Sequence, residues 1–566
     1  MYHTTSSRPF QVQGSCSFEC DRMMIKGVFV TKKLYSILSG LASEMGVKEP
    51  NFKVEVPKNK THGDLSSNIA LALAKTLDRN PMELAKEISE KLKIDSSLIS
   101  KIEIAAPGFI NFWFSQEYLS SRVQNIIKED DLYGSIDLGK GKKASVEYVS
   151  ANPTGPLHIG NARGGPLGDI IANIMQKAGY RVSREYLHND IGGQVEKLGE
   201  TIYYLLNPSD KPKDYELQYR GEYVYDLAKE VNTKLHNSKL SKEEFMKEAG
   251  KIAVEIMLEQ ILEDCKLMGI NFDKITKESE LRKDVSKTLD RLKNSLKENE
   301  GALWFAPSDQ YLKDRETVVR KSNGEYTYFA SDIVYHNQKL SENDIAIDVL
   351  GVNHSGHVPK LFAVAKALGH NPDSLKVVLY QFVRLKQGSE SLKMSKREGT
   401  FVTAKEVLQE VGKDAFRFFL VSQNNQSHID FDIELAKKRA AENPVFYVQY
   451  AYTRIASIFA KLKTENLKLK TDDLGSKLKE KEELELMRLL LQLPTLVETV
   501  AQNFAVNLIT NYSVELATSF HRFYEKQQVL SVESELKNAR LALLKATQIT
   551  LRNTLDLLGI SAPEKM

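Results

Sequence analysis

The 566-residue sequence has little of several things, and each scarcity excludes a class of protein. It contains only three cysteines, Cys16, Cys20 and Cys265, too few for a disulfide framework or a four-cysteine zinc site. No stretch reaches the roughly 18 consecutive apolar residues of a membrane-spanning helix. We therefore expect a protein with no membrane span and no protein-bound metal, in a reducing compartment such as the cytoplasm.

A large excess of either charge is also missing. The 78 basic and 75 acidic residues leave a net charge of only +3. Any nucleic acid must then be held by a local basic surface rather than by overall charge. What the sequence does contain is 42% hydrophobic residues and a length that predicts several domains of about 100–200 residues each.

The first 23 residues differ from the rest of the chain. They have no continuous apolar stretch, so they do not form a secretory signal. They are rich in serine and threonine, but Glu19 and Asp21 argue against a transit peptide. We interpret residues 1–23 either as a disordered leader or as the result of an upstream start codon, with Met23 or Met24 as the working start.

Residues 24–115 mix helical and strand patterns. The stretch "TKKLYSILSGLASEMG" has apolar residues at helical spacing, and "DLSSNIALALAKTLDRNP" predicts a helix capped by Asp64 or Ser66. The stretch "KIEIAAPGFINFWF" predicts two strands around a Pro-Gly turn. We expect a small α+β module here, followed by a connector over residues 116–143.

From residue 144 the pattern changes to strand, turn and helix. "KASVEYVSANP" predicts a strand, "TGPLHIGN" a turn, "ARGGPLGDIIANIMQKAG" a helix and "YRVSREYLHND" a second strand. This βαβ unit implies a parallel sheet. The alternation continues to residue 443 around a charged, helix-rich insertion at about 195–300, and residues 444–566 predict an all-α bundle.

The turn "TGPLHIGN" has the features of a phosphate site. Gly155 and Gly160 allow a ligand to approach the backbone closely, and His158 adds a hydrogen-bond donor. The following helix offers free N–H groups and the positive end of its dipole. The turn matches neither GxGxxG nor GxxxxGK[ST], so on its own it is equally consistent with a tight strand-to-helix connection.

A second stretch, "GSESLKMSKREGTFVT", places Lys393, Lys396 and Arg397 around a serine. Alone, such a basic loop is usually no more than solvated surface. Together with an upstream HIG turn on a βαβ unit, it resembles the two signatures of class I aminoacyl-tRNA synthetases. The resemblance implies a Rossmann-like α/β catalytic core with ATP at the carboxyl ends of the strands. It assigns ATP binding to His158, Gly160, Asn161, Lys393, Met394, Ser395 and Lys396.

The chemistry that the resemblance implies is formation of an aminoacyl-adenylate from an amino acid and ATP with Mg²⁺. As the amino acid carboxylate attacks the α-phosphate, negative charge moves toward the leaving pyrophosphate. Lys393 and Lys396 are suited to neutralise that charge, and His158 is the third expected catalytic residue. A carboxylate nucleophile needs no general base, so positioning and electrostatics carry the catalysis.

Longer stretches narrow the resemblance to one family. "VEYVSANPTGPLHIGNARGG", "REYLHNDIGGQ", "YTYFASDIVYH" and "LLGISAPEKM" are similar to arginyl-tRNA synthetases of the bacterial type, and the likeness runs from about residue 30 to 566. It implies ligation of L-arginine to its tRNA through an arginyl-adenylate, with release of pyrophosphate and AMP. It also implies a monomer, and tRNA that must bind before arginine is activated.

A pocket for arginine needs carboxylates that match a planar, charged guanidinium. By the resemblance, Glu147, Tyr328 and Asp332 hold that group, and Tyr328 and Asp332 are one helical turn apart. Tyr328 could instead be a core aromatic and Asp332 a helix N-cap. A carboxylate such as Glu147 on a central strand is costly unless it is paired. The rest of the implied arginine site is Asn152, Asn353 and His158.

The sequence departs from the family pattern at two places. The family turn usually ends in histidine, and here it ends in Asn161. Asn353 and Ser355 stand where many relatives have aspartate and histidine. An asparagine can still donate a hydrogen bond to phosphate or ribose, so we expect activity to survive. Other hypotheses are a different class I ligase or nucleotidyltransferase on this fold, and a non-catalytic RNA-binding paralogue.

The C-terminal helices resemble an anticodon-binding domain. "NPVFYVQYAYTRIASI" displays aromatic residues that could stack on unpaired bases, and we take Tyr447, Tyr450 and Arg454 as the tRNA contacts. The alternative is that the tyrosines belong to a helix core. The N-terminal module is expected to contact the tRNA elbow, with Lys58, Lys60 and Arg79 as candidates.

Overall fold

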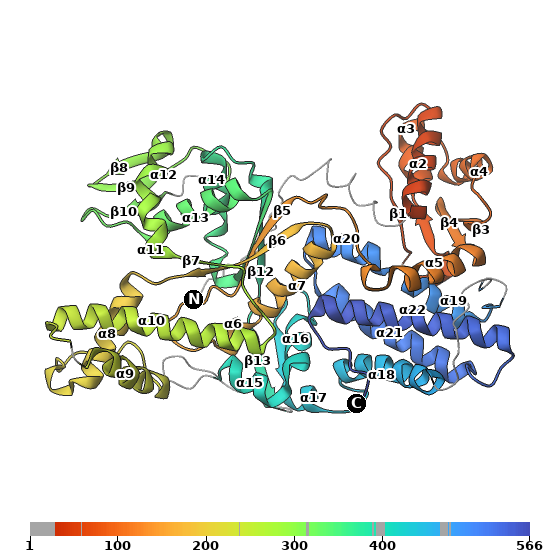
Figure 1. Ribbon diagram of the computed structural model, residues 1–566. Coiled ribbons are helices and arrows are strands. Elements are labelled where there is room, and N and C mark those ends of the chain that lie inside the picture. Colours follow the sequence, from red (N-terminus) through yellow and green to blue (C-terminus); the bar gives the residue numbers. More distant parts are fainter. Residues whose placement is uncertain are drawn as a thin grey trace, which may run out of the picture. The chain divides into compact units, whose positions relative to one another are not determined.

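The computed structural model in Figure 1 describes residues 29–566 except 58, 237, 313–315, 388–389, 392–401, 464–473 and 475–476. The expected leader, Lys58 and the KMSK stretch lie outside the described residues. Packing divides the chain into two compact units. One contains the described residues within 1–124 and 472–499, and the other those within 125–471 and 500–566.

The first unit is the expected α+β module with a helix from a distant part of the chain. Its four strands form an antiparallel sheet in the order β1-β2-β4-β3. The strands are β1 (Val54–Glu55), β2 (Leu65–Ser67), β3 (Ile99–Ala105) and β4 (Phe109–Phe114), so the predicted pair around the Pro-Gly turn is confirmed. The helices are α2 (Phe29–Glu44), α3 (Ile69–Leu77), α4 (Pro81–Lys91) and α19 (Lys481–Leu490). The helix α5 (Gln116–Glu129) spans the boundary with the second unit.

The predicted helix cap at Asp64 or Ser66 is wrong, because both residues bond to strand β4 instead. The Asp64 carboxylate accepts a hydrogen bond from the Phe114 N–H at 2.7 Å. It also forms an ion pair with Arg488, whose Nε lies 2.6 Å away. Ser66 Oγ donates to Asn111 Oδ1 at 2.7 Å. These contacts hold the segment as strand β2, and α3 begins only at Ile69.

The second unit is built on a parallel five-stranded sheet, as predicted, in the order β12-β11-β5-β6-β7. The strands are β5 (Lys143–Glu147), β6 (Arg181–His188), β7 (Lys274–Lys277), β11 (Ile345–Gly351) and β12 (Leu375–Tyr380). The central strand β5 is buried from Ala144 to Glu147, which is typical of a parallel sheet covered on both faces.

Helices connect these strands. The helix α6 (Ile159–Ala162) continues into α7 (Gly164–Lys177) between β5 and β6, α13 (Tyr328–Glu342) precedes β11, and α14 (Val358–Ala367) joins β11 to β12. The helix α7 approaches β5 at Gly168, where a Cβ atom would overlap the buried Tyr148 ring.

The expected insertion forms a helical subdomain of α8 (Gly193–Leu206), α9 (Glu222–Leu235) and α10 (Lys242–Leu267), with its own apolar core. The predicted range of 195–300 is too wide, because it includes β7 of the central sheet. Next come α11 (Glu278–Leu281), α12 (Val285–Arg291) and an antiparallel sheet of β8 (Leu296–Asn299), β9 (Ala302–Phe305) and β10 (Thr317–Arg320).

Beyond β12 a small sheet precedes the helical part. It contains β13 (Val383–Gln387), β14 (Glu390–Ser391) and β15 (Ile429–Asp432), and β13 pairs in parallel with β15. Besides α19, the helices that follow β14 are α15 (Ala404–Val411), α16 (Lys413–Val421), α17 (Ile433–Lys437), α18 (Pro444–Lys463), α20 (Leu493–Asn503), α21 (Asn507–Lys526) and α22 (Ser534–Leu558). No helix in the described part of the chain is both long and apolar enough to cross a membrane.

Candidate active site

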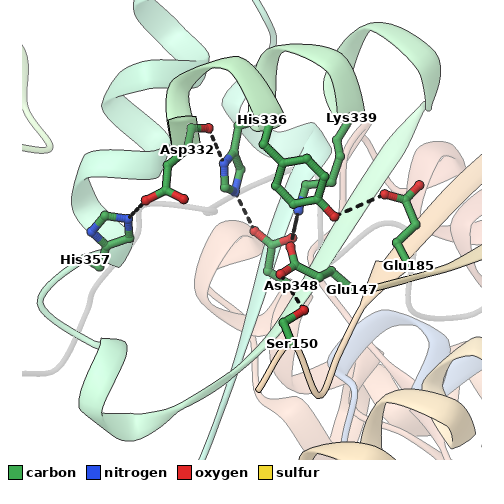
Figure 2. Close-up of polar contacts among 9 residues, drawn as sticks. Glu147, Ser150, Glu185, Asp332, His336, Lys339, Asp348 and His357 are labelled. Atoms are coloured by element: carbon green, nitrogen blue, oxygen red, sulfur yellow. Dashed lines mark hydrogen bonds and ion pairs between the residues drawn. The ribbon is translucent and has the colours of Figure 1, made fainter. Parts of the chain in front are cut away.

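Two buried carboxylates lie side by side on the central strands. Glu147 ends β5 and pairs in register with Asp348 on β11. Lys339 from α13 reaches both (Figure 2): its Nζ lies 2.7 Å from Glu147 Oε2 and also bonds Asp348 Oδ1. Burial alone would lower the pKa of Lys339, but the two carboxylates outweigh it and hold the pKa above its usual range. Glu147 is therefore paired, as a carboxylate in this position must be.

His336 completes this cluster. Its Nδ1 lies 2.8 Å from the Asp332 carbonyl oxygen, and its Nε2 lies 2.8 Å from Asp348 Oδ2. Burial favours the neutral form of Asp348, but Lys339 and His336 outweigh it and hold the Asp348 pKa well below its usual range. Both ring nitrogens of His336 are thus engaged, one with the main chain of α13 and one with Asp348. The Lys339 ammonium thus lies between the Glu147 and Asp348 carboxylates.

Four polar side chains follow one side of α13 at helical spacing: Tyr328, Asp332, His336 and Lys339. We call them the α13 stripe. The N-cap of this helix is Thr327, so the interpretation of Asp332 as an N-cap is wrong. The Asp332 side chain is 24% exposed and that of Lys339 only 1%, so the stripe runs from solvent into the interior.

Asp332 is held in place before any substrate arrives. Its Oδ2 lies 2.9 Å from Nε2 of His357, the residue before α14 (Figure 2). The His357 ring meets Phe329 edge to face, with 5.6 Å between ring centroids. Asp332 Oδ1 has no hydrogen-bond partner among the described residues. One carboxylate oxygen therefore remains for a ligand.

Glu278, the first residue of α11, is another carboxylate near Asp332. It is 2% exposed, and its Oε1 accepts a hydrogen bond from Ser331 Oγ at 3.1 Å. Burial raises the pKa of Glu278 to about 7, and the charge of Asp332 adds to this rise. Glu278 in turn adds to the raised pKa of Tyr328, whose main cause is burial. Nothing in the sequence pointed to this residue.

Tyr328 lies at the outer end of the stripe. It is 42% exposed, so it is not a core aromatic. Its hydroxyl lies over Gly192, where an added Cβ would approach the Tyr328 oxygen to 2.5 Å. Gly192 has φ +97°, so both its backbone and its neighbour exclude a side chain.

The HIG turn is held by a hydrogen bond between two of its own residues. His158 is the N-cap of α6, and its Nδ1 accepts a hydrogen bond from the Gly160 N–H at 2.8 Å. In a neutral ring the proton is then on Nε2. A Cβ at Gly160 would come within 2.9 Å of His158 Nδ1, which explains the glycine. The main-chain carbonyl of Asn161 accepts a hydrogen bond from Tyr380 Oη at 3.2 Å.

The candidate ATP residues Lys393, Met394, Ser395 and Lys396 lie outside the described residues. The chain that follows them returns to the HIG turn. The Ile159 N–H donates to the Val402 carbonyl at 3.3 Å, and the Ala404 N–H donates to the Leu157 carbonyl at 2.8 Å. His158 and Thr403 are antiparallel bridge partners. The HIG turn is therefore hydrogen-bonded through its main chain to the residues that follow the KMSK stretch.

The two candidate asparagines both lie just past the ends of central strands. Asn152 follows β5 and is exposed, with its Oδ1 accepting a hydrogen bond from Asn189 Nδ2 at 3.2 Å. Asn353 follows β11 and is also exposed. Among the described residues, neither asparagine bonds to the α13 stripe. Glu147 is connected to Asp332 through Lys339, Asp348 and His336.

Some of the missed residues do have a recognisable signal in the sequence. Asp348 interrupts the apolar strand "IAIDVLG", which is the same anomaly that singled out Glu147. Lys339 follows Asp332 by seven residues, the spacing of two helical turns. His357 has no such signal, because its partner Asp332 is far away in the sequence.

The candidate tRNA residues form an aromatic cluster between α18 and α21. The rings of Tyr447 and Tyr450 lie 4.8 and 5.8 Å from that of His521. Arg454 Nη1 donates to Tyr450 Oη at 3.1 Å, and Tyr450 is 39% exposed. In the N-terminal module, Arg79 is paired with Glu87 at 2.8 Å, and Lys58 and the Lys60 side chain lie outside the described part.

Three family models match consecutive parts of the chain. They are "Arginyl tRNA synthetase N terminal domain" over residues 30–114, "tRNA synthetases class I (R), catalytic domain" over 122–452 and "DALR anticodon binding domain" over 448–566.

Relatives are similar over nearly the whole chain. An arginine–tRNA ligase of Carboxydothermus hydrogenoformans is 41% identical over 91% of this chain and 94% of its own. An arginine–tRNA ligase of Listeria monocytogenes is 40% identical over 94% of this chain and 98% of its own. A solved structure, a putative arginyl-tRNA synthetase from Campylobacter jejuni, is 31% identical with a TM-score of 0.72 over 80% of this chain and 100% of its own. The chain therefore belongs to the arginyl-tRNA synthetase family, class I enzymes that use ATP to join arginine to its tRNA.

Proposed function

We propose that arginine binds at the exposed end of the α13 stripe. Asp332 offers its Oδ1 to the guanidinium while His357 holds Oδ2, and the Tyr328 hydroxyl and Glu278 complete the charge match. The observation that carries this proposal is the fixed, partly exposed Asp332 carboxylate at the carboxyl ends of the strands.

Glu147 has a second role in this pocket besides its ion pair. A carboxylate has about four lone-pair sites, and Ser150 and Lys339 each use one on Glu147. The remaining sites serve the substrate cation. Asn152 and Asn353, just beyond β5 and β11, bind the α-amino and carboxylate groups, and His158 lies between arginine and ATP.

ATP enters as its Mg²⁺ complex, which is a substrate and not a resident cofactor. Its phosphates bind the turn of His158, Gly160 and Asn161 and the KMSK residues Lys393, Met394, Ser395 and Lys396. The arginine carboxylate attacks the α-phosphorus, pyrophosphate leaves, and the tRNA ribose hydroxyl then takes the arginyl group with release of AMP. Lys393 and Lys396 neutralise the leaving pyrophosphate.

The enzyme acts as a cytoplasmic monomer with the RNA held at several places. The domains are a module over 24–115, a connector over 116–143, a catalytic domain over 144–443 and an anticodon-binding domain over 444–566. Tyr447, Tyr450 and Arg454 contact tRNA from α18, where an exposed ring and a cation lie together.

Exchange of pyrophosphate label into ATP tests this function. We expect exchange with L-arginine and tRNA together, much less without tRNA, and none when arginine is replaced by another amino acid. Pyrophosphate exchange that depends on a different amino acid would refute the arginine pocket. Absence of exchange under all conditions would refute catalysis.

A further inference from the structure

Arg163 directly follows the HIG turn and the short helix α6, and its side chain is almost completely buried, at 1% exposure. Among the described residues no carboxylate contacts its guanidinium. The group donates instead to six main-chain carbonyl oxygens at 2.7–3.1 Å, those of Gln381, Leu420, Gln423, Asn424, Asn425 and Ser427. Burial lowers the pKa of Arg163 to about 10, so the group is still charged at neutral pH.

Two of the six carbonyls precede strands, and the other four belong to the last turn of α16 and the loop that follows it. Gln381 lies between β12 and β13, and Ser427 lies just before β15. The strands β13 and β15 pair in parallel from Val383 and Ile429 onward. The Arg163 guanidinium thus connects the end of the HIG turn with the residues that precede β13 and β15.

The same segment is tied to the turn at its other end. From β13 the sequence continues through β14 and the KMSK stretch to Val402 and Ala404, which are hydrogen-bonded to Ile159 and Leu157. Tyr380, the last residue of β12, adds a hydrogen bond to the Asn161 carbonyl. The HIG turn is therefore held against both ends of residues 380–404.

We propose that Arg163 is a positioning residue for ATP. Its side chain sets the position of the His158–Asn161 turn relative to strands β13 and β15, and does so without touching the substrate. This inference rests on the proposed ATP role of the turn. Arginine suits the task because it presents five N–H donors in a rigid plane, whereas lysine has three donors on one atom.

Arg163→Lys tests the proposal, and Arg417→Lys is the matched control. Arg417 is also fully buried, but its partners are the Leu558 and Met268 carbonyls and Asp169, none of which belongs to the turn or to strands β13 and β15. For Arg163→Lys we expect the KM for ATP to rise about 10- to 100-fold, because small displacements of a substrate-holding turn are costly. The KM for arginine should change less than about threefold.

For Arg417→Lys we expect a lower melting temperature but both KM values close to wild type. Wild-type exchange with arginine is measured first, so loss of the proposed function is distinguished from loss of positioning. An unchanged KM for ATP in Arg163→Lys, or an equal rise in Arg417→Lys, would overturn the inference. If Arg163→Lys does not fold, Tyr380→Phe is used instead, because it removes only the hydrogen bond from Tyr380 to the Asn161 carbonyl. Its KM for ATP should rise about threefold or more, and an unchanged value would also overturn the inference.

Discussion

A carboxylate that receives arginine must be charged, accessible and already in place. In the proposed pocket, Asp332 is accessible and in place, because His357 fixes one oxygen while the side chain stays partly exposed. Asp348 is charged but enclosed by Lys339 and His336. Glu278 is enclosed, and its burial outweighs the ion pair with Arg282 at 3.4 Å and raises its pKa to about 7. Three carboxylates near one helix thus differ because of their neighbours.

Asp332→Asn should be a severe change for arginine and a mild one for ATP. The amide keeps the shape but leaves the guanidinium half-paired, a loss of about 3–5 kcal/mol. We expect kcat/KM for arginine to fall about 10²- to 10³-fold or more, measured by pyrophosphate exchange. Asp226→Asn, at an exposed ion pair with Lys229, is the control and should behave as wild type. Near-normal arginine kinetics in Asp332→Asn would remove this residue from the pocket.

Glu278 predicts a pH dependence of arginine binding. Its pKa is about 7 in the folded protein against 4.5 for an ordinary glutamate. Between these values the unfolded chain has lost a proton that the folded chain keeps, so the free energy of unfolding falls as pH rises and levels off above about 7. A bound guanidinium favours the carboxylate, so arginine binding releases this proton below that pH.

The affinity for arginine should therefore rise with pH up to about 7 and then become constant. Calorimetric titration with arginine over this range, in two buffers of different ionisation enthalpy, measures both affinity and proton release. Glu278→Gln should bind arginine with a much flatter pH profile. A profile as steep as that of wild type would show that another group is responsible.

At the scale of secondary structure, close contact between α7 and β5 places the HIG turn and Glu147 at the same end of the sheet. The contact depends on Gly168, because any side chain would overlap Tyr148, the residue after Glu147. We expect Gly168→Ala to lower the free energy of unfolding by about 1–3 kcal/mol.

Denaturant unfolding followed by circular dichroism measures the effect of Gly168→Ala. Gly193→Ala, at the start of α8, is the control, because a Cβ there meets nothing within 4 Å. Its stability should be unchanged or slightly higher, since alanine favours helix. Equal stability of the two variants would show that α7 can move away from β5 at no cost.

Local patterns predicted the elements whose partners are adjacent in sequence. The βαβ unit and the strands around the Pro-Gly turn could be predicted because apolar spacing and turn residues specify them directly. The short strand β2 was missed because its bonds go to Asn111 and Phe114 on another strand. The candidate site divides in the same way: Glu147 and Asp332 stand out locally, whereas His357 and Glu278 depend on pairings across the fold.

At the scale of the whole molecule, the first compact unit is discontinuous in sequence. The ion pair of Asp64 with Arg488 joins its early and late parts. Arg488→Met would leave a buried carboxylate with one hydrogen bond, and we expect the unit to lose about 3 kcal/mol of stability. Hydrogen exchange should show weaker protection of β2 and β4, with β5 and β11 unchanged.

Arg79→Met is the control for Arg488→Met within the same unit. Arg79 pairs with Glu87 at an exposed position, 43% for the arginine side chain, where solvent screening leaves such a pair little effect on stability. Protection that falls equally in β5 and β11 would contradict the division into two units. Similar losses in Arg79→Met and Arg488→Met would contradict a special role for the buried pair.

The discontinuous unit has a consequence for synthesis on the ribosome. The strands β1 to β4 are translated early, but Arg488 is added about 370 residues later. At about 5–20 residues per second the delay is roughly 20–75 s. Until then the nascent N-terminal module carries Asp64 without its arginine and without α19. A module that is translated early is thus completed only when a much later part of the chain emerges.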